Sequence, residues 1–175
     1  MEPIRLVPVS EEYAGAIAEY AAQFPAERMR VTLKPDRIPG LDGLEECADV
    51  RSWLGSCAEM AGKISWFLSV RERDGKVVGA LVLRHSLKYD DDDPEFASHF
   101  GYSIRPDEQR KGYAKEQLRL GLEEARKLGL TSVRLVCRDL NIGSGRTIRS
   151  CGGVYLDSIT GEESGMRIDR YDIAL

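Results

Sequence analysis

The sequence predicts an α/β (α+β) fold, in which a mixed, mostly antiparallel central sheet is flanked by helices. The dipeptide Asp74-Gly75 separates two runs of β-forming residues, which is typical of a hairpin and therefore of antiparallel pairing. Further along the chain, an amphipathic helix separates two strand-like segments, His99 to Ile104 and Thr131 to Cys137. A hairpin together with a β-α-β crossover indicates one mixed sheet with helices on its faces.

Length, composition and charge limit the class of protein. The chain has 175 residues, of which 42% are hydrophobic and 31% charged, as is ordinary for one globular domain spanning residues 1–175. Its net charge of −4 argues against nonspecific nucleic-acid binding. No stretch approaches the roughly 20 apolar residues that cross a bilayer, and the first residues lack the layout of a signal peptide. We therefore expect a cytoplasmic protein with no membrane and no nucleic acid among its partners.

The first elements follow from apolar spacing and capping residues. Ile4 to Val9 predicts a strand, and Ser10 is a suitable N-cap for the helix that follows. Pro25 ends this helix, and residues 31–43 hold two prolines and two glycines, which indicates a loop. A second helix is expected from Leu44 to Met60. Its apolar stripe is formed by Leu44, Cys47, Val50, Leu54 and Cys57.

The cysteines and histidines form no metal-binding pattern. None of the four cysteines belongs to a C-x-x-C pair, and the two histidines are not spaced for a zinc site. Free cysteines are often buried, and disulfides are rare in a reducing cytosol. We therefore expect no metal, and we interpret the cysteines as small buried hydrophobes.

Two strands are expected around the Asp74-Gly75 turn, from Ser65 to Glu72 and from Lys76 to His85. The second run is almost continuously apolar, which predicts a strand covered on both faces. Lys88 to Ser98 holds four consecutive aspartates, and we interpret it as a solvated loop. A metal site or an attraction for cationic substrates is the alternative, because clustered carboxylates repel one another unless they are neutralised.

The C-terminal half continues with the strand from His99 to Ile104 and an amphipathic helix that Gly129 ends. A strand from Thr131 to Cys137 follows. The remaining predicted elements are a short helix over Asn141 to Ser150 and strands over Val154 to Thr160 and Met166 to Ala174.

Between the fourth strand and its helix lies Gln109-Arg110-Lys111-Gly112-Tyr113-Ala114, a turn that can hold a phosphate. The N–H groups at a helix start are unpaired, and the helix dipole places partial positive charge there, so a diphosphate can bind. Gly112 has no Cβ and allows close approach of a ligand to the backbone. The stretch is neither a nucleotide P-loop nor a dinucleotide fingerprint, since neither glycine pattern occurs.

The same stretch resembles the coenzyme A loop of the GCN5-related N-acetyltransferases (the GNAT family), whose pattern is Gln/Arg-x-x-Gly-x-Gly/Ala. Gln109, Gly112 and Ala114 match its three specified positions. The resemblance extends over residues 76 to about 157, whereas the first 60 residues fit only in the order of their elements. The segments that carry it are Phe100 to Pro106, Val133 to Cys137, and Asn141-Ile-Gly-Ser144 followed by Gly152-Gly153.

The resemblance implies the acyl-CoA N-acyltransferase fold and transfer of an acetyl group from acetyl-CoA directly to an amine of a small molecule or a protein. In that family the fourth and fifth strands splay apart, and the pantetheine arm fills the gap like an added strand. One backbone amide of the fourth strand would also hold the acyl oxyanion. The cofactor-binding residues implied are Tyr102, Ser103, Ile104, Gln109, Arg110, Lys111, Gly112, Tyr113, Ala114, Lys115, Asn141 and Ser144.

The acid and the base of the reaction depart from the family pattern. An alkyl amine with a pKa of about 10.4 is mostly protonated at neutral pH, so its proton must be removed and the leaving thiolate must be protonated. Many family members have a tyrosine that acts as the general acid seven residues after the Asn that corresponds to Asn141. This chain has Ile148 at that position. The candidate acids are Tyr102, Ser144 and Cys151, and the candidate bases are His85, His99, Glu45 and Glu46.

Two other functions stay open. A catalytically weak acyl-CoA-binding module that senses or regulates would also fit the missing tyrosine, and an acyltransferase could use another donor, such as succinyl-CoA. The helices between residues 10 and 60 and the loop over 86–98 are expected to shape the acceptor site, but they do not identify the amine. A homodimer formed through terminal strands is a further expectation from the resemblance.

Overall fold

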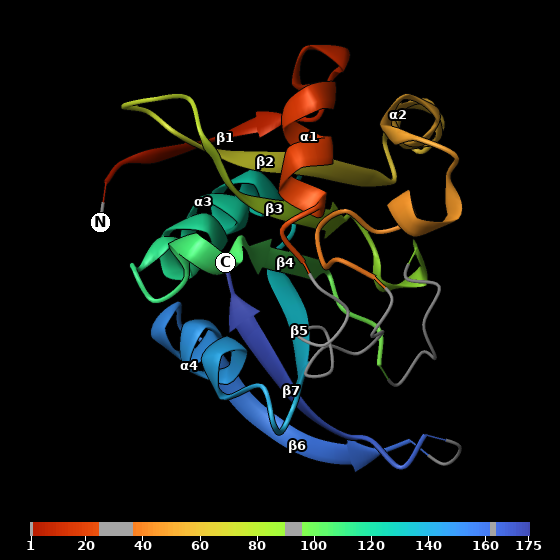
Figure 1. The fold of residues 1–175 in the computed structure, drawn as a ribbon. Helices are drawn as coiled ribbons and strands as arrows, with labels where there is room; N and C mark the ends of the chain where they lie inside the picture. Colours follow the sequence, from red (N-terminus) through yellow and green to blue (C-terminus); the bar gives the residue numbers. More distant parts are fainter. Residues whose placement is uncertain (1, 25–36, 90–95, 162–163) are drawn as a thin grey trace.

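The structure is a computed structural model, and it describes residues 2–24, 37–89, 96–161 and 164–175 (Figure 1). Its helices and strands are β1 (Ile4–Pro8), α1 (Ala14–Ala21), α2 (Val50–Glu59), β2 (Ile64–Arg71), β3 (Val77–Arg84), β4 (Phe100–Ile104), α3 (Tyr113–Lys127), β5 (Ser132–Arg138), α4 (Ile142–Ser150), β6 (Val154–Thr160) and β7 (Arg167–Ala174). Short 3₁₀ helices lie at Glu11–Tyr13, Leu44–Glu46, Leu87–Tyr89 and Pro106–Glu108. This succession confirms the predicted α/β order.

The described strands form two antiparallel sheets. The first has the order β1-β2-β3-β4 and the second the order β5-β7-β6. The predicted hairpin is confirmed, because β2 and β3 pair around a turn in which Gly75 has a φ of 70°. The predicted, mostly antiparallel α/β fold class is also confirmed. The expectation of one mixed sheet is wrong, because β4 and β5 do not pair along their length and the described strands divide into two sheets between them (Figure 1).

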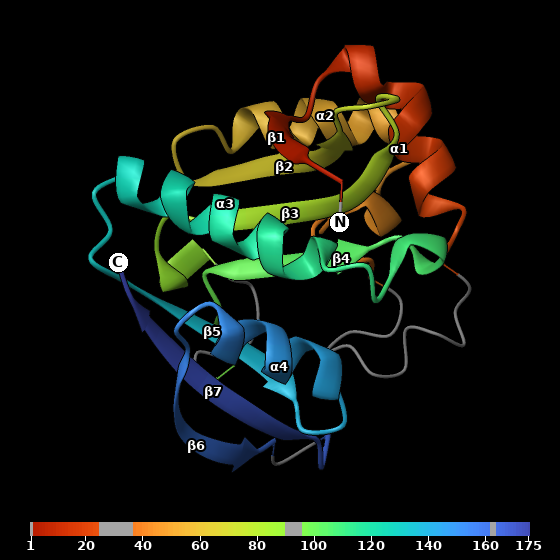
Figure 2. The same cartoon turned by 90° about the vertical axis from the view of Figure 1, so that its left-hand side faces the viewer.

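Helices cover both faces of the first sheet. On one face, Val82 of β3 packs in a buried cluster with Trp53 of α2 and Trp66 of β2. On the other face, Leu81 of β3 packs in a second cluster with Leu118 of α3. Figure 2 shows α3 lying across this face, with α1 and α2 behind the strands. The two coverings explain why β3 is almost continuously apolar in sequence.

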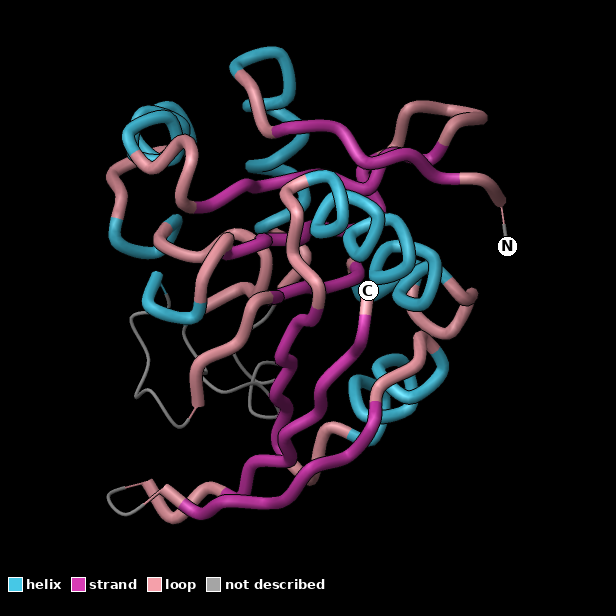
Figure 3. The backbone as a smooth tube through the Cα atoms, turned by 180° about the vertical axis from the view of Figure 1, so that it is seen from behind, coloured by secondary structure: helices cyan, strands magenta, loops and turns pink. Residues whose placement is uncertain are grey.

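The second sheet is covered by α4. Ile148 of α4, Leu135 of β5 and Tyr171 of β7 belong to the same buried cluster as Leu118 of α3. Figure 3 shows α3 and α4 next to each other from behind, and the two helices are in contact. One core therefore joins the two sheets even though their strands do not pair.

The second helix is shorter than predicted. It begins at Val50, because Asp49 accepts a hydrogen bond from the Ser52 N–H at 2.8 Å and caps the helix there. Leu44 lies in a separate 3₁₀ turn, and Cys47 has extended backbone angles. The prediction that the helix begins at Leu44, and that Leu44 and Cys47 belong to its stripe, is therefore wrong.

Residues 25–36 and 90–95 lie outside the described residues. They include part of the predicted loop over 31–43 and, in the loop from Lys88 to Ser98, the four consecutive aspartates. Within the described ranges, none of the helices has the length and apolar character that a membrane span needs. In the same ranges, no three His, Cys, Asp or Glu side chains gather as they would around a metal ion.

Candidate active site between two diverging strands

β4 and β5 touch where they begin and then diverge. The N–H of His99, just before β4, donates to the Arg134 carbonyl at 2.9 Å, and the Arg134 N–H donates to His99 Nδ1 at 2.9 Å. Beyond this contact the two strands belong to different sheets. α3 follows the end of β4 and α4 follows the end of β5, so both helices begin at the open end of the gap (Figure 2).

The ladder between β3 and β4 determines which backbone groups of β4 face this gap. At its two ends, the Arg84 N–H donates to the His99 carbonyl at 2.8 Å and the Arg105 N–H donates to the Val78 carbonyl at 3.0 Å. Because antiparallel pairs alternate, odd-numbered residues of β4 bond to β3 and even-numbered residues direct their backbone groups towards β5. Tyr102 is the central even-numbered residue.

Side chains occupy the ends of this free edge but not its centre. Ser98 Oγ accepts from the Phe100 N–H at 3.3 Å and donates to the Phe100 carbonyl at 2.9 Å, while Gln109 Nε2 donates to the Ile104 carbonyl at 3.1 Å. By the same alternation, the amide and carbonyl of Tyr102 point away from β3, and within the described residues no side chain bonds to them. Such an edge can pair with an extended ligand, and a single amide there can stabilise an oxyanion.

The side chain of Tyr102 bridges the gap to α4. Its hydroxyl lies 2.9 Å from Ser144 Oγ. Asn141 Oδ1 accepts from the Ser144 N–H at 3.1 Å and caps α4. Burial raises the pKa of the Tyr102 phenol, against the opposing effect of the Ser144 bond, so the hydroxyl stays protonated at neutral pH. The structure thus brings together Tyr102, Asn141 and Ser144, three of the predicted site residues.

The predicted phosphate loop presents an open helix N-terminus at the same end of the gap. Gly112 is the N-cap of α3 with a φ of 91°, and Arg110 is also left-handed with a φ of 59°. The Glu116 N–H is the first to bond within the helix, donating to the Gly112 carbonyl at 3.3 Å. No side chain of the described residues caps the N–H groups of residues 113–115. An open helix N-terminus of this kind can hold an anion.

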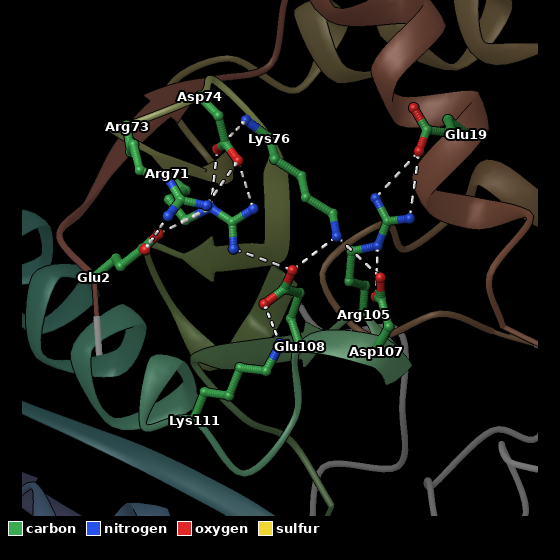
Figure 4. A network of polar contacts seen from close by, with 10 residues as sticks. All are labelled: Glu2, Glu19, Arg71, Arg73, Asp74, Lys76, Arg105, Asp107, Glu108 and Lys111. Atoms are coloured by element: carbon green, nitrogen blue, oxygen red, sulfur yellow. Dashed lines mark hydrogen bonds and ion pairs between the residues drawn. The ribbon is translucent and has the colours of Figure 1, made fainter.

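A buried carboxylate anchors this loop to the β2–β3 hairpin (Figure 4). Glu108 is 4% exposed, and it accepts from Arg71 Nη1 at 3.1 Å, from Lys76 Nζ at 2.7 Å and from Lys111 Nζ at 2.8 Å. Burial alone would raise the pKa of Glu108, but the bonds from Lys111 and Lys76 and the nearby charges lower it to about 2. The carboxylate is therefore ionised, and it holds the loop before α3 against the β2–β3 hairpin.

Several predicted loop residues use their side chains within the protein. Gln109 bonds to the Ile104 carbonyl, Lys111 pairs with Glu108, and Tyr113 is 3% exposed. Their contribution to a ligand would come from the backbone. The side chains of Arg110 and Lys115, in contrast, are exposed at the loop surface.

The opposite face of β4 is covered by contacts that the sequence did not predict. Ser103 Oγ donates to the Pro39 carbonyl at 2.6 Å and lies 3.0 Å from the Tyr20 hydroxyl. Asp42 lies over Gly101, since its Oδ2 would be 3.3 Å from a Cβ placed there. The side chain of Ser103 therefore faces α1, and its backbone bonds to β3 rather than to the gap.

Both histidines are held by backbone or hydroxyl groups. His85 Nδ1 donates to the Gly62 carbonyl at 3.0 Å, which leaves Nε2 to accept from the Ser65 hydroxyl at 2.8 Å. His99 Nδ1 accepts from the Arg134 N–H, and burial lowers the pKa of the ring. These contacts favour structural roles for both residues.

The other candidate acids and bases are buried in the core, hydrogen-bonded or paired with an arginine. Ile148, at the family's tyrosine position, is fully buried in the core. Cys151 Sγ donates to a carbonyl in the first turn of α3 at 3.5 Å, and burial raises the pKa of its thiol. Arg37 pairs with Glu45 at 2.6 Å and with Glu46 at 3.5 Å.

Comparisons with known proteins agree with this geometry. A family model described as the acetyltransferase (GNAT) domain matches residues 4–154. No curated protein matches the chain. Solved structures match over nearly its whole length, at identities that show the fold alone.

One of these structures is the ribosomal L7/L12 alpha-N-protein acetyltransferase RimL in complex with coenzyme A, with 16% identity, a TM-score of 0.75, and coverage of 98% of this chain and 94% of that chain. The ribosomal-protein-S5-alanine acetyltransferase of Vibrio fischeri has 16% identity and a TM-score of 0.75, with coverage of 99% of this chain and 94% of that chain. The spermidine N-acetyltransferase of Vibrio cholerae, in complex with CoA and spermine, has 14% identity and a TM-score of 0.70. The match covers 98% of this chain and 95% of that chain.

The family match includes β4, the loop around Gly112, α3, β5 and α4, the elements that form the gap. The chain therefore belongs to the GCN5-related N-acetyltransferase (GNAT) family and is an acyl-CoA-dependent N-acyltransferase.

Proposed function

We propose that this protein is an N-acetyltransferase that moves an acetyl group from acetyl-CoA directly to an amine of a small molecule or a protein. The observation that carries the proposal is the presence of two open sites on one gap: the free backbone edge at Tyr102 and the open α3 N-terminus after Gly112. An extended thioester arm fits the first and a diphosphate fits the second. Coenzyme A carries both groups.

In this proposal the diphosphate lies over the N–H groups of residues 113–115, where Gly112 leaves room for it. The pantetheine arm runs along the free edge of β4, with Asn141 and Ser144 on the opposite wall. Two structural neighbours, the L7/L12 acetyltransferase and the spermidine acetyltransferase, are complexes with coenzyme A, which supports the choice of donor.

The chemistry uses the groups at the centre of the gap. The amine nitrogen bonds to the acyl carbon, the Tyr102 amide holds the oxyanion, and the C–S bond then breaks. The Tyr102 hydroxyl, paired with Ser144, protonates the thiolate as it leaves. The proton of the amine leaves through water, since both histidine rings use their acceptor nitrogens within the described protein.

The acceptor is proposed to enter through the pocket that Asp42 and Arg84 line beside Gly101, on the side of β4 opposite the Tyr102 side chain. The structural neighbours are named for acetylating ribosomal-protein N-termini or spermidine. These names support an amine as the acceptor and leave a protein amino group and a small polyamine as the first classes to test.

The test is release of free thiol from acetyl-CoA with a panel of amines: polyamines, peptides that begin with Ala or Ser, and small monoamines. Calorimetry measures coenzyme A binding, and succinyl-CoA serves as the alternative donor. We expect micromolar binding of coenzyme A and turnover with at least one amine. A protein that binds no coenzyme A would refute the proposal, whereas tight binding without turnover on any amine would indicate an acyl-CoA sensor.

A further inference from the structure

Glu108 divides its two carboxylate oxygens between different parts of the molecule. Oε1 accepts from Arg71 and Lys76 of the hairpin, and Oε2 accepts from Lys111 of the loop. Figure 4 shows the Lys111 side chain extending from the loop to Glu108. Lys111 is the single cation on Oε2 among the residues that the structure describes.

This division makes Lys111 difficult to replace as a partner. Arg71 and Lys76 have further carboxylates, because Arg71 pairs with Asp74 at 2.6 Å and Lys76 with Asp107 at 2.9 Å. If the Lys111 ammonium moved away, Oε2 would stay buried and charged without a donor, which is unfavourable. The bond at 2.8 Å is also charge-assisted, and therefore stronger than a neutral one.

The two other cations of the loop are placed differently. The side chains of Arg110 and Lys115 are exposed, and in the ranges described no carboxylate forms an ion pair with either. Arg110 precedes the open N–H groups of α3, and Lys115 carries one of them. They are thus available to an anion at the helix N-terminus, while the ammonium of Lys111 is occupied.

Building on the function proposed above, we propose that Glu108 is a positioning residue that holds Lys111 out of contact with the diphosphate of the cofactor. The loop then grips the diphosphate with its backbone N–H groups, Arg110 and Lys115. Coenzyme A is also the product that must leave after each turnover, and each extra cation on the diphosphate would slow its release. Withholding Lys111 keeps the affinity for the cofactor moderate.

The first experiment compares matched charge removals by calorimetry with coenzyme A. In the presence of Glu108, Lys111→Met should weaken binding less than about twofold, whereas Arg110→Met or Lys115→Met should weaken it about fivefold, as expected for an exposed ion pair. The three variants lose the same charge within the same six residues. A loss of binding for Lys111→Met as large as for the other two would overturn the inference.

The second experiment releases Lys111 by Glu108→Gln. The Gln oxygen can still accept from Arg71 and Lys76, but its NH₂ group faces the Lys111 ammonium and cannot accept from it. We expect coenzyme A to bind this variant about fivefold tighter, through the freed lysine. Losing a negative charge near the loop can also tighten binding, so the double variant Glu108→Gln, Lys111→Met is needed.

In the Glu108→Gln variant, adding Lys111→Met should remove the expected fivefold gain in affinity for coenzyme A. In the wild-type protein, which retains Glu108, Lys111→Met should have little effect on that affinity. Additive effects in this cycle would refute the inference. If Glu108→Gln fails to fold, as judged by circular dichroism, the three methionine variants still decide the question. If Arg110→Met, Lys115→Met and Gly112→Val all leave coenzyme A binding unchanged, the loop assignment of the proposed function fails instead.

Discussion

Tyr102 of β4 and Ser144 of α4 meet across the gap, with their hydroxyl oxygens 2.9 Å apart. The gap is closed at its other end by the contact between His99 and Arg134. The phenol therefore reaches α4 near the open end of the gap, and burial keeps it protonated by raising its pKa. In the proposed mechanism the thioester lies along the free backbone edge at Tyr102. The hydroxyl of the same residue is then suited to protonate the leaving thiolate.

Tyr102→Phe should lower kcat with little effect on the KM for acetyl-CoA. The substitution retains the ring that packs in the core and removes only the hydroxyl. We expect a loss of roughly 10- to 100-fold, at the lower end of what a general acid contributes, because water can partly replace it. Steady-state kinetics with a saturating amine measure the change. Ser144→Ala, alone or combined with Tyr102→Phe, should give a similar loss, since residues that act as a unit are not additive.

A second Tyr–Ser pair provides the control for this prediction. The Tyr155 hydroxyl lies 2.8 Å from Ser158 Oγ on the exposed strand β6. Tyr155→Phe removes an equivalent hydrogen bond outside the gap and should leave kcat unchanged. Equal losses in Tyr155→Phe and Tyr102→Phe would show that the effect is structural rather than a loss of the acid.

Gly112→Val should weaken coenzyme A binding about tenfold or more while the fold survives. Gly112 has a φ of 91°, which a β-branched residue adopts only with strain, and a side chain there would stand where the diphosphate approaches the N–H groups of α3. Calorimetry with coenzyme A measures the loss, and circular dichroism checks the fold.

Gly129 offers a matched control at the other end of the same helix. It has a φ of 79°, and a Cβ there would have no neighbour within 4 Å. Gly129→Val should therefore strain the backbone similarly and leave coenzyme A binding intact. If both variants lose binding equally, the effect of Gly112→Val reports helix stability, and the assignment of the diphosphate site is contradicted.

Local chemistry explains which features could be predicted from the sequence. The turn into a helix at Gly112, the Asp74-Gly75 hairpin and the helix stop at Gly129 each depend on residues next to one another, and each is confirmed as local structure. The binding role of the Gly112 turn stays a prediction. The start of α2 was mispredicted for a local reason as well. The apolar spacing continues back to Leu44, but the hydrogen bond from the Ser52 N–H to Asp49 favours a helix that begins at Val50.

Contacts between distant residues could not be predicted in this way. Tyr102 and Ser144 were each candidates, yet their hydrogen bond depends on how α4 packs against β4. The ion pair between Asp42 and Arg84, at 2.6 Å, joins residues 42 positions apart and has no sequence signature. Glu108 has no sequence signature for the same reason, because its partners come from the end of β2, the β2–β3 turn and the loop before α3.

Ile148→Tyr should not restore the family's usual acid. The Ile148 side chain is fully buried, and a Cβ on Gly153 would already overlap it, so a larger ring has no room. We expect the free energy of unfolding to fall by about 1–3 kcal/mol, the usual cost of overpacking, with no rise in kcat. Urea denaturation measures the first and steady-state kinetics the second. Ile148→Leu, which conserves volume, should cost less than about 1.5 kcal/mol. An active, stable Ile148→Tyr variant would show that this position can reach the gap after all.

His99 should make the stability of the protein depend on pH. Its Nδ1 accepts the Arg134 N–H, so the neutral ring holds β4 to β5, and burial lowers its pKa below the ordinary value. The folded protein therefore binds this proton more weakly than the unfolded chain, whose histidines titrate near about 6.5. The stability contributed by the neutral ring is complete above this value and is lost as the pH falls towards the folded-state pKa.

His99→Gln tests this dependence, because the Gln oxygen can accept the Arg134 N–H and does not titrate. Urea denaturation at about pH 7.5 and about pH 5.5 gives the free energy of unfolding of each protein in each condition. We expect the wild-type protein to lose more stability between the two conditions than the variant does. The other groups that titrate in this range contribute equally to the change in both proteins, so their contribution cancels in the comparison. An equal loss in both proteins would contradict the assignment of His99 as the neutral ring that joins the two diverging strands.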